Sequence, residues 1–244
     1  MRKGRSRPFH ALALSLLLTL PLTLPGLAVS APRTTLPEVV PAPFVYDRPL
    51  PLSLPEPNWF ADALFLGDSR VEGLRELGSI EAGLWLTQVG LNVRAARTES
   101  YAVEGQNLPL AQALEGKRFS KVYLCLGVNE AAWMPEADFY AEYAGLIDDL
   151  RLLLPNAQIY VQTIIPVTMS RAAARAPDNG LLAQRNALLA RLCREKQVFL
   201  VDVASAFTGA NGALTQSLSA DGLHLNETGN QLLAQYLTTH IFGT

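Results

Sequence analysis

Apolar runs of strand length alternate with amphipathic helical stretches through residues 58–244. Strands are predicted at 63–66, 92–98, 121–126, 158–165 and 197–203, and helices at 70–77, 80–89, 107–114, 135–154, 178–196 and 226–241. Strands separated by helices pair in parallel, because parallel neighbours need a crossover connection. The pattern therefore predicts an α/β domain with a central parallel five-stranded sheet and helices on both faces.

The first 28 residues are typical of a secretory signal peptide. A basic start (residues 2–7) precedes an almost wholly apolar stretch at 9–20, and small residues then permit cleavage after Ala28. Cleavage after Ala31 also fits but would leave Pro32 at the new N-terminus. An uncleaved membrane anchor is the alternative, although the apolar core is short for a span of ~20 residues. We expect export, with the protein periplasmic or extracellular.

Residues 29–57 are predicted to be a proline-rich spacer. Eight prolines lie between positions 31 and 57, and proline lacks the N–H that helices and central strands require. The stretch is either an extended linker or a collar on the domain, where residues 44–46 (Phe-Val-Tyr) could dock it. Residues 58–244 are long enough to form one domain with a full core.

Composition excludes several classes of function. The formal net charge is −2, and four of the 20 Lys and Arg residues lie in the signal segment, so a nucleic-acid partner is not expected. Metal-ligand spacing is absent, because the mature part has only His224 and His240 and no Cys-x-x-Cys. Cys125 and Cys193 read as buried small apolar residues, with a disulfide as the alternative that export permits.

Ser69 has the position of a candidate nucleophile. It follows the apolar run 63–66 and the pair Gly67-Asp68, where a strand should end and a helix begin. Ligands of open α/β sheets bind at the carboxyl edge of the strands. A serine there needs an adjacent general base to attack an acyl group.

His224 is the candidate base. It lies in a loop between the last strand and the last helix, which a parallel sheet places at the same edge as Ser69. Asp221 precedes it by three residues, and Gly222 between them permits a tight bend, so the carboxylate can orient the imidazole. A surface turn is the alternative for this motif. His240 is interpreted as a helix-terminal residue.

Acyl transfer also needs hydrogen-bond donors for the oxyanion. The Ser69 N–H is one candidate, and the Asn129 side chain, which follows a central strand, is another. Gly90 could supply a backbone N–H, and Gly83 is its rival. The alternatives are a turn residue for Asn129 and a helix C-cap for Gly90.

These residues together resemble the four sequence blocks of the SGNH (GDSL) hydrolase family, in the family's order. The blocks are Gly67-Asp68-Ser69-Arg70, Gly90, Gly127-Val128-Asn129-Glu130 and Asp221-Gly222-Leu223-His224. The stretches 65–73 and 90–93 are similar to a bacterial exported branch that reads GDSR. The resemblance spans residues 58–244, and the chain lacks the G-x-S-x-G elbow of α/β-hydrolases.

The resemblance implies a flavodoxin-like three-layer α/β/α fold with no metal or organic cofactor. It implies Ser69 as nucleophile, His224 as base and Asp221 as the residue that orients the base. It further implies Ser69, Gly90 and Asn129 as oxyanion donors. The chain departs from the family at two positions: Arg70 replaces the usual leucine and Glu130 the usual aspartate.

Three further residues are candidates for substrate contact. Arg70 could hold an anionic or polyhydroxyl substrate, or it is a solvated residue of the first helical turn. Trp133 and Trp85 could stack on a sugar, or they are partly buried core residues. The stretches 133–135 and 168–180 are read as specificity loops, the second with Arg171 and Arg175 overhanging the site.

The sequence therefore predicts an exported esterase that cleaves acyl esters, and we expect O-acetyl esters. The substrate would be a carbohydrate or a lipid of the cell envelope or the extracellular space. Its partners would be small-molecule or polysaccharide esters, with association with the cell envelope and a monomeric state expected. An O-acetyltransferase using the same three residues is one alternative. A non-catalytic glycan-binding module is the other.

Overall fold

The computed structural model describes residues 46, 48–53, 57–174 and 177–242. The chain divides into two units, residues 1–42 and 43–244, and all described residues belong to the second. The predicted signal peptide (1–28), much of the predicted spacer (29–57), and Phe44 and Val45 lie outside the described residues.

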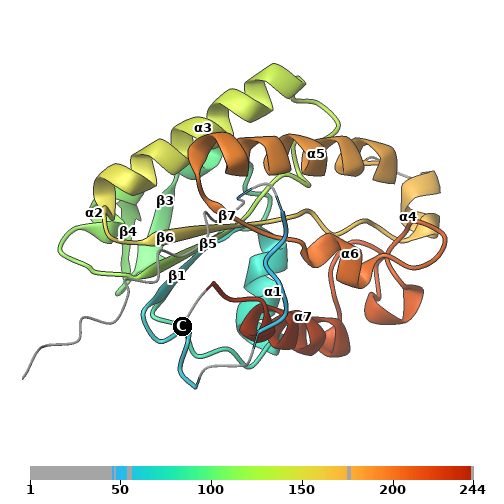
Figure 1. Ribbon diagram of the computed structural model, residues 1–244, viewed down its shortest axis with the longest axis horizontal. Coiled ribbons are helices and arrows are strands. Elements are labelled where there is room, and N and C mark those ends of the chain that lie inside the picture. Colours follow the sequence, from blue (N-terminus) through green and yellow to red (C-terminus); the bar gives the residue numbers. More distant parts are fainter. Residues whose placement is uncertain (1–45, 47, 54–56, 175–176, 243–244) are drawn as a thin grey trace, which may run out of the picture. The chain divides into compact units, whose positions relative to one another are not determined.

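Five parallel strands form the central sheet (Figure 1). They are β1 (Ala63–Gly67), β2 (Leu84–Thr87), β5 (Lys121–Cys125), β6 (Gln158–Gln162) and β7 (Phe199–Val201), in the order β2-β1-β5-β6-β7. Every neighbouring pair is parallel. The prediction of a parallel five-stranded sheet is confirmed.

Helices cover both faces of this sheet and give three layers (Figure 1). Helices α3 (Glu136–Leu153) and α5 (Asn179–Lys196) pack together on one face, and α1 (Ser69–Leu77) and α7 (Glu227–Thr239) on the other. Alternate residues of β1 serve the two cores: Leu64 and Leu66 face the α3–α5 side, and Phe65 faces the α1–α7 side. The flavodoxin-like three-layer α/β/α fold is confirmed.

The helix predicted at 80–89 is wrong, because Leu84–Thr87 is the edge strand β2. Leu84, Leu86 and Val89 have spacing that a helix and a short strand can share. Pairing with β1 decides the outcome: Leu84 lies opposite Leu64 and Leu86 opposite Leu66.

The strand predicted at 92–98 is also wrong. The segment is a loop with one 3₁₀ turn, Ala95–Arg97. It leads into an antiparallel hairpin, β3 (Ser100–Val103) and β4 (Gln106–Pro109), followed by the short helix α2 (Leu110–Leu114). Glu104 and Gly105 form the turn of this hairpin, both with positive φ.

Residues 48–53 lie along the edge of the sheet. Pro49 makes a parallel bridge to Leu200 in β7, and the Leu50 N–H donates to the Leu200 carbonyl at 3.1 Å. Tyr46 packs its ring against Phe199, with centroids 5.6 Å apart. Ser53 donates through its N–H and its hydroxyl to the Thr239 carbonyl. This part of the proline-rich stretch therefore packs on the domain, whereas the division of the chain at residue 57 remains a prediction.

Candidate active site

The candidate residues all follow strands at their carboxyl ends. Ser69 begins α1 two residues after β1 ends, and Gly90 follows β2. Asn129 follows β5, and His224 lies between β7 and α7. The parallel sheet therefore brings four segments that are distant in the sequence to one edge.

Ser69, His224 and Asp221 form a hydrogen-bonded chain. The Ser69 Oγ lies 2.9 Å from His224 Nε2, and His224 Nδ1 lies 2.7 Å from Asp221 Oδ2. With the proton on Nδ1, the Nε2 atom is free to accept the serine proton. The three side chains thus have the geometry of a nucleophile, a base and an orienting carboxylate.

The Asp221 loop is built to keep its carboxylate charged. Burial opposes ionisation, but N–H donors from His224 and Leu223, each 2.8 Å from Oδ1, and the His224 ring hold the pKa of Asp221 well below its usual range. Ser219 supports the bend, because its hydroxyl donates to the His224 carbonyl at 2.5 Å and accepts the Gly222 N–H at 2.9 Å. This loop presents His224 in one orientation.

Asp68 caps the helix that carries Ser69. Its Oδ1 accepts the Arg70 N–H at 2.9 Å, and its carbonyl accepts from Val71 and Glu72. These bonds leave the Ser69 N–H outside the cap, at the positive end of the helix dipole. Burial raises the pKa of Asp68 to about 6, despite the opposing effects of Arg70 and His224.

Asn129 lies between Asp68 and the loop after β2. Its Nδ2 donates to the Leu91 carbonyl at 2.9 Å and lies 3.5 Å from Asp68 Oδ2. The second contact is at the limit of a hydrogen bond, so one amide hydrogen remains available to an oxyanion.

Gly90 lies beside this contact, one residue before Leu91. Its φ of +77° is a conformation that glycine adopts readily, in a turn closed by the Leu91 N–H and the Gln88 carbonyl. Gly83 instead precedes β2 and donates to the Phe60 carbonyl, at the opposite edge of the sheet. The structure therefore excludes Gly83 and keeps Gly90 as the candidate.

Glu130 connects the loop that follows β5, which carries Asn129, to the loop that follows β2, which carries Gly90. It is fully buried, and its Oε1 accepts the Val93 N–H at 2.7 Å. Burial raises the pKa of Glu130 to about 7, although the Val93 N–H acts against this. The departure from the usual aspartate thus links Asn129's loop to the loop of Gly90.

Arg70 does not occupy either predicted environment. Only 7% of the residue is exposed, and Nη1 donates to the Ile165 carbonyl at 2.6 Å. The guanidinium therefore lies in the protein interior and binds a backbone carbonyl there. The prediction that Arg70 contacts substrate is wrong.

The two tryptophans differ in their surroundings. Trp133 is 55% exposed, and its indole Nε1 donates to the Asn129 carbonyl at 2.9 Å, which fixes the ring beside the candidate site. Trp85 stacks on Phe65 with ring centroids 4.4 Å apart, as a core residue would. Trp133 remains a candidate for substrate contact and Trp85 does not.

The stretch 168–180 is not a simple loop. Met169–Ala174 forms the short helix α4, and α5 begins at Asn179 behind an Asp178 cap. Arg171 lies against the base loop, since a Cβ built on Gly222 would be 2.8 Å from the Arg171 Cβ. Arg175 lies outside the described residues.

Cys125 and Cys193 are free thiols, and burial raises the pKa of each to about 12. Within the described part of the chain, no cluster of three or more His, Cys, Asp or Glu side chains is arranged to hold a metal ion. Among the helices at residues 57–174 and 177–242, none is long and apolar enough to cross a membrane.

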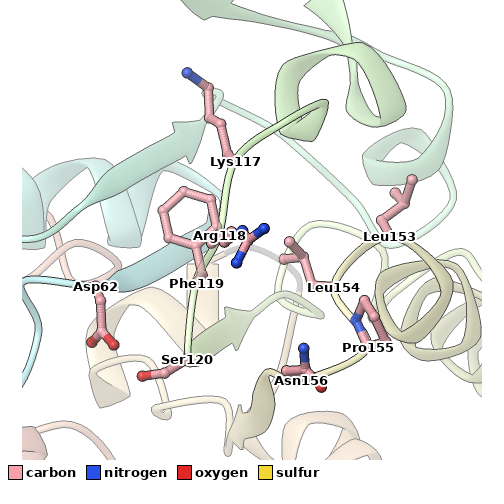
Figure 2. A pocket seen from close by; sticks show the side chains of 9 residues that line it. All are labelled: Asp62, Lys117, Arg118, Phe119, Ser120, Leu153, Leu154, Pro155 and Asn156. Carbon is pink, nitrogen blue, oxygen red and sulfur yellow. The ribbon is translucent and has the colours of Figure 1, made fainter.

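A surface hollow of about 500 Å³ lies away from these residues (Figure 2). Asp62, Ser120 and Asn156 line it, just before β1, β5 and β6, with Arg118 between Phe119 and Leu154 in the view. These positions belong to the amino ends of the strands. The hollow is therefore at the edge opposite Ser69.

The sequence did not reveal three parts of the site: the Asp68 cap, the Ser219 support of the base loop and the Glu130–Val93 link. Each depends on which backbone groups the fold brings close together. Asp68 had a signal, because an aspartate before a helix is a preferred N-cap. Ser219 and Glu130 had none beyond their nearness to the motifs.

Comparison with known proteins identifies the family. The model of the GDSL-like lipase/acylhydrolase family matches residues 65–232. A search of curated proteins finds no match.

Solved structures share the fold. A candidate platelet activating factor from Streptococcus pneumonia is 23% identical with a TM-score of 0.59, covering 73% of this chain and 82% of its own. A candidate acylhydrolase from Bacteroides fragilis is 16% identical with a TM-score of 0.56, covering 76% and 88%. The acetyl xylan esterase AlAXEase is 18% identical with a TM-score of 0.53, covering 72% and 96%.

The family match spans all four sequence blocks, and the three-layer fold places them at one edge of the sheet. The chain belongs to the GDSL-like lipase/acylhydrolase (SGNH) family and is a serine hydrolase that acts on esters.

Proposed function

We propose that this protein is an exported esterase in which Ser69, His224 and Asp221 form the catalytic triad. The observation that carries the proposal is the chain of two hydrogen bonds, 2.9 Å and 2.7 Å long, that joins these side chains. Ser69 Oγ attacks the acyl carbon while His224 Nε2 takes its proton, and Asp221 stabilises the imidazolium that results.

The tetrahedral oxyanion is held by the Ser69 N–H, the Gly90 N–H and Asn129 Nδ2. The bond to the alcohol then breaks, and His224 returns its proton to the leaving oxygen. Water, activated by the same imidazole, hydrolyses the acyl-Ser69 ester and restores the free serine. The bond to the Leu91 carbonyl supports this role of Asn129. It uses one of the two Nδ2 hydrogens to hold the amide in place and leaves the other for the oxyanion.

We propose further that the substrate is an O-acetylated carbohydrate. Trp133 supports this, since its exposed ring is fixed next to the oxyanion loop by a hydrogen bond to Asn129. A fixed aromatic face suits stacking on a pyranose ring, which is apolar on its faces and polar at its edge. The predicted signal peptide, with its apolar stretch at residues 9–20, fits a substrate outside the cytoplasm.

Ser69→Ala tests the triad. We expect kcat/KM for a short acyl ester to fall by about 10⁴-fold or more, with an unchanged thermal unfolding curve. Hydrolysis at the parent rate by the purified variant would overturn the assignment.

Trp133 variants test the substrate. For an acetylated oligosaccharide, Trp133→Ala should raise KM about tenfold, while p-nitrophenyl acetate hydrolysis stays within about threefold of the parent. Trp133→Phe keeps the stacking face and should retain most of the affinity. Equal losses on both substrates would contradict a carbohydrate contact, and acetyl transfer to an acceptor sugar in excess of hydrolysis would indicate a transferase.

Export has its own test. In cells producing the full chain, N-terminal sequencing of the mature protein should begin at Val29, and the protein should be found outside the cytoplasm. An intact Met1 in the cytoplasmic fraction would contradict export.

A further inference from the structure

Arg70 follows the candidate nucleophile directly and turns its charge into the protein. The residue is 93% buried, since its exposed fraction is 7%, and Nη1 makes a short bond of 2.6 Å to the Ile165 carbonyl. Hydrogen bonds from a charged donor are stronger than neutral ones. The bond ties the first turn of α1 to the segment that follows β6.

That segment, residues 165–168, supports the base loop. The Thr168 N–H donates to the Gly222 carbonyl at 2.9 Å, between Asp221 and His224 in the chain. The contact is close: Gly222 has a φ of +82°, and a Cβ built there would lie 2.4 Å from Thr168 Oγ1. The base loop therefore rests on Thr168 with little space between them.

The supporting segment is itself held from a third side. Asn179, the first residue of α5, accepts the Val167 N–H at 2.8 Å and donates to the Val167 carbonyl at 2.9 Å. The Leu214 N–H donates to the same carbonyl at 3.1 Å. Movement of residues 165–168 would break several hydrogen bonds at once.

Arg70 and the base loop also share a small cavity. Arg70, Cys125 and Gln162 line an internal cavity of about 10 Å³ together with Leu223 and Leu225, the two chain neighbours of His224. Arg70 thus approaches the base loop both through residues 165–168 and across this cavity.

The charge of Asp68 offsets part of the cost of burying Arg70. Burial disfavours the cation, and Asp68, on the other side of Ser69, is the largest opposing influence on the pKa of Arg70. Asp68 is itself buried and is favoured in its charged form mainly by Arg70. The two charges stabilise each other on either side of the nucleophile.

We propose that Arg70 is a positioning residue, which fixes the distance between Ser69 and His224 by linking the start of α1 to residues 165–168 and hence to the base loop. The inference rests on the proposed role of the triad. A leucine, the family's usual residue, could fill part of this volume but could not reach the Ile165 carbonyl as a donor. A shift of about 1 Å between reacting groups can cost 10²-fold in rate.

The test compares Arg70→Leu and Arg70→Lys with Arg75→Leu, a control on the exposed side of the same helix. For a short acyl ester, we expect Arg70→Leu to lower kcat about 10- to 100-fold and to leave KM within about threefold. Arg70→Lys keeps the positive charge and a donor group, so its kcat should fall only about 3- to 10-fold. Arg75→Leu should match the parent.

Three outcomes would overturn the inference: parent kcat in both Arg70 variants, a loss confined to KM, or a lysine variant no better than the leucine variant. If Arg70→Leu fails to fold, Arg70→Lys decides by its kcat, provided that it unfolds at the parent temperature. The proposed function fails separately, because hydrolysis that survives Ser69→Ala contradicts the triad whatever the Arg70 variants do.

Discussion

Asp221 uses its two carboxylate oxygens for different tasks. Oδ1 accepts two backbone N–H groups, and Oδ2 faces the His224 ring at 2.7 Å. The first oxygen shapes the loop, and the second selects the tautomer of the base. The pKa of Asp221 is held well below its usual range, so the carboxylate stays charged through the neutral range and into mild acid.

Asp221→Asn should preserve the conformation of the base loop but no longer favour the His224 tautomer that carries its proton on Nδ1. An asparagine oxygen can replace Oδ1, but its NH₂ group would face Nδ1 and favour a proton on Nε2, which cannot then accept from Ser69. We expect kcat for a short acyl ester to fall by about 10²- to 10⁴-fold. Asp178→Asn, a substitution at the cap of α5, is the control. Activity of Asp221→Asn within threefold of the parent would contradict the orienting role.

The strands in the middle of the sheet were predictable from the sequence, whereas the edge strand β2 and the β3–β4 hairpin were not. β5 and β6 are buried on both faces, and their apolar runs were found within a few residues of their ends. β2 is a four-residue edge strand whose pattern also fits a helix. The β3–β4 hairpin was missed because Glu104-Gly105 is a weaker turn signal than Asn-Gly or Asp-Gly.

Some residues of the candidate site could likewise be predicted from the sequence, and others could not. Ser69, Asn129, Asp221 and His224 carry chemistry in short motifs, so their types and spacing were informative. The environment of Arg70 depends on the Ile165 carbonyl, 95 residues away, and that of Glu130 on the Val93 N–H, 37 residues away. Such contacts arise only when the strands have been ordered in the sheet.

Glu130 links two loops at a cost that depends on pH. Burial raises the pKa of Glu130 from 4.5 to about 7. The unfolded chain therefore releases this proton at lower pH than the folded protein does. Stability from this group is full below pH 4.5 and is lost as the pH rises towards 7.

Glu130→Gln should remove that loss. The amide oxygen of the glutamine can still accept the Val93 N–H. The parent loses stability between pH 5 and 8 and the variant does not, so the difference between their free energies of unfolding should shift in favour of the variant by on the order of 3 kcal/mol. Urea unfolding at both pH values measures this. Glu136→Gln, at an exposed position in α3, should differ from the parent by less than about 0.5 kcal/mol. If the free energy of unfolding of Glu130→Gln instead falls relative to that of the parent as the pH rises, Glu130 is not a buried carboxyl group with a raised pKa.

At the scale of the domain, residues 48–53 cover part of one edge of the sheet. β7 is an edge strand, and an uncovered edge offers unpaired backbone groups to other chains. The bridge from Pro49 to Leu200 covers part of that edge, and proline suits it because its missing N–H is not needed there.

Leu50→Ala tests how much this segment contributes. Leu50 is 3% exposed, so truncation should lower the free energy of unfolding by roughly 2–4 kcal/mol while kcat/KM stays at the parent value. Leu52→Ala, 75% exposed in the same segment, should change it by less than about 0.5 kcal/mol. Equal effects of the two substitutions in urea unfolding would show that the segment does not pack as described.

Covalent labelling of Ser69 tests the central claim most directly. A fluorophosphonate probe reacts with serines that a neighbouring base activates, and peptide mass spectrometry locates the adduct. We predict one adduct, on Ser69, which is absent in Ser69→Ala and forms at least 100-fold more slowly in His224→Ala. An adduct on another residue, or labelling of Ser69→Ala at the parent rate, would contradict the account.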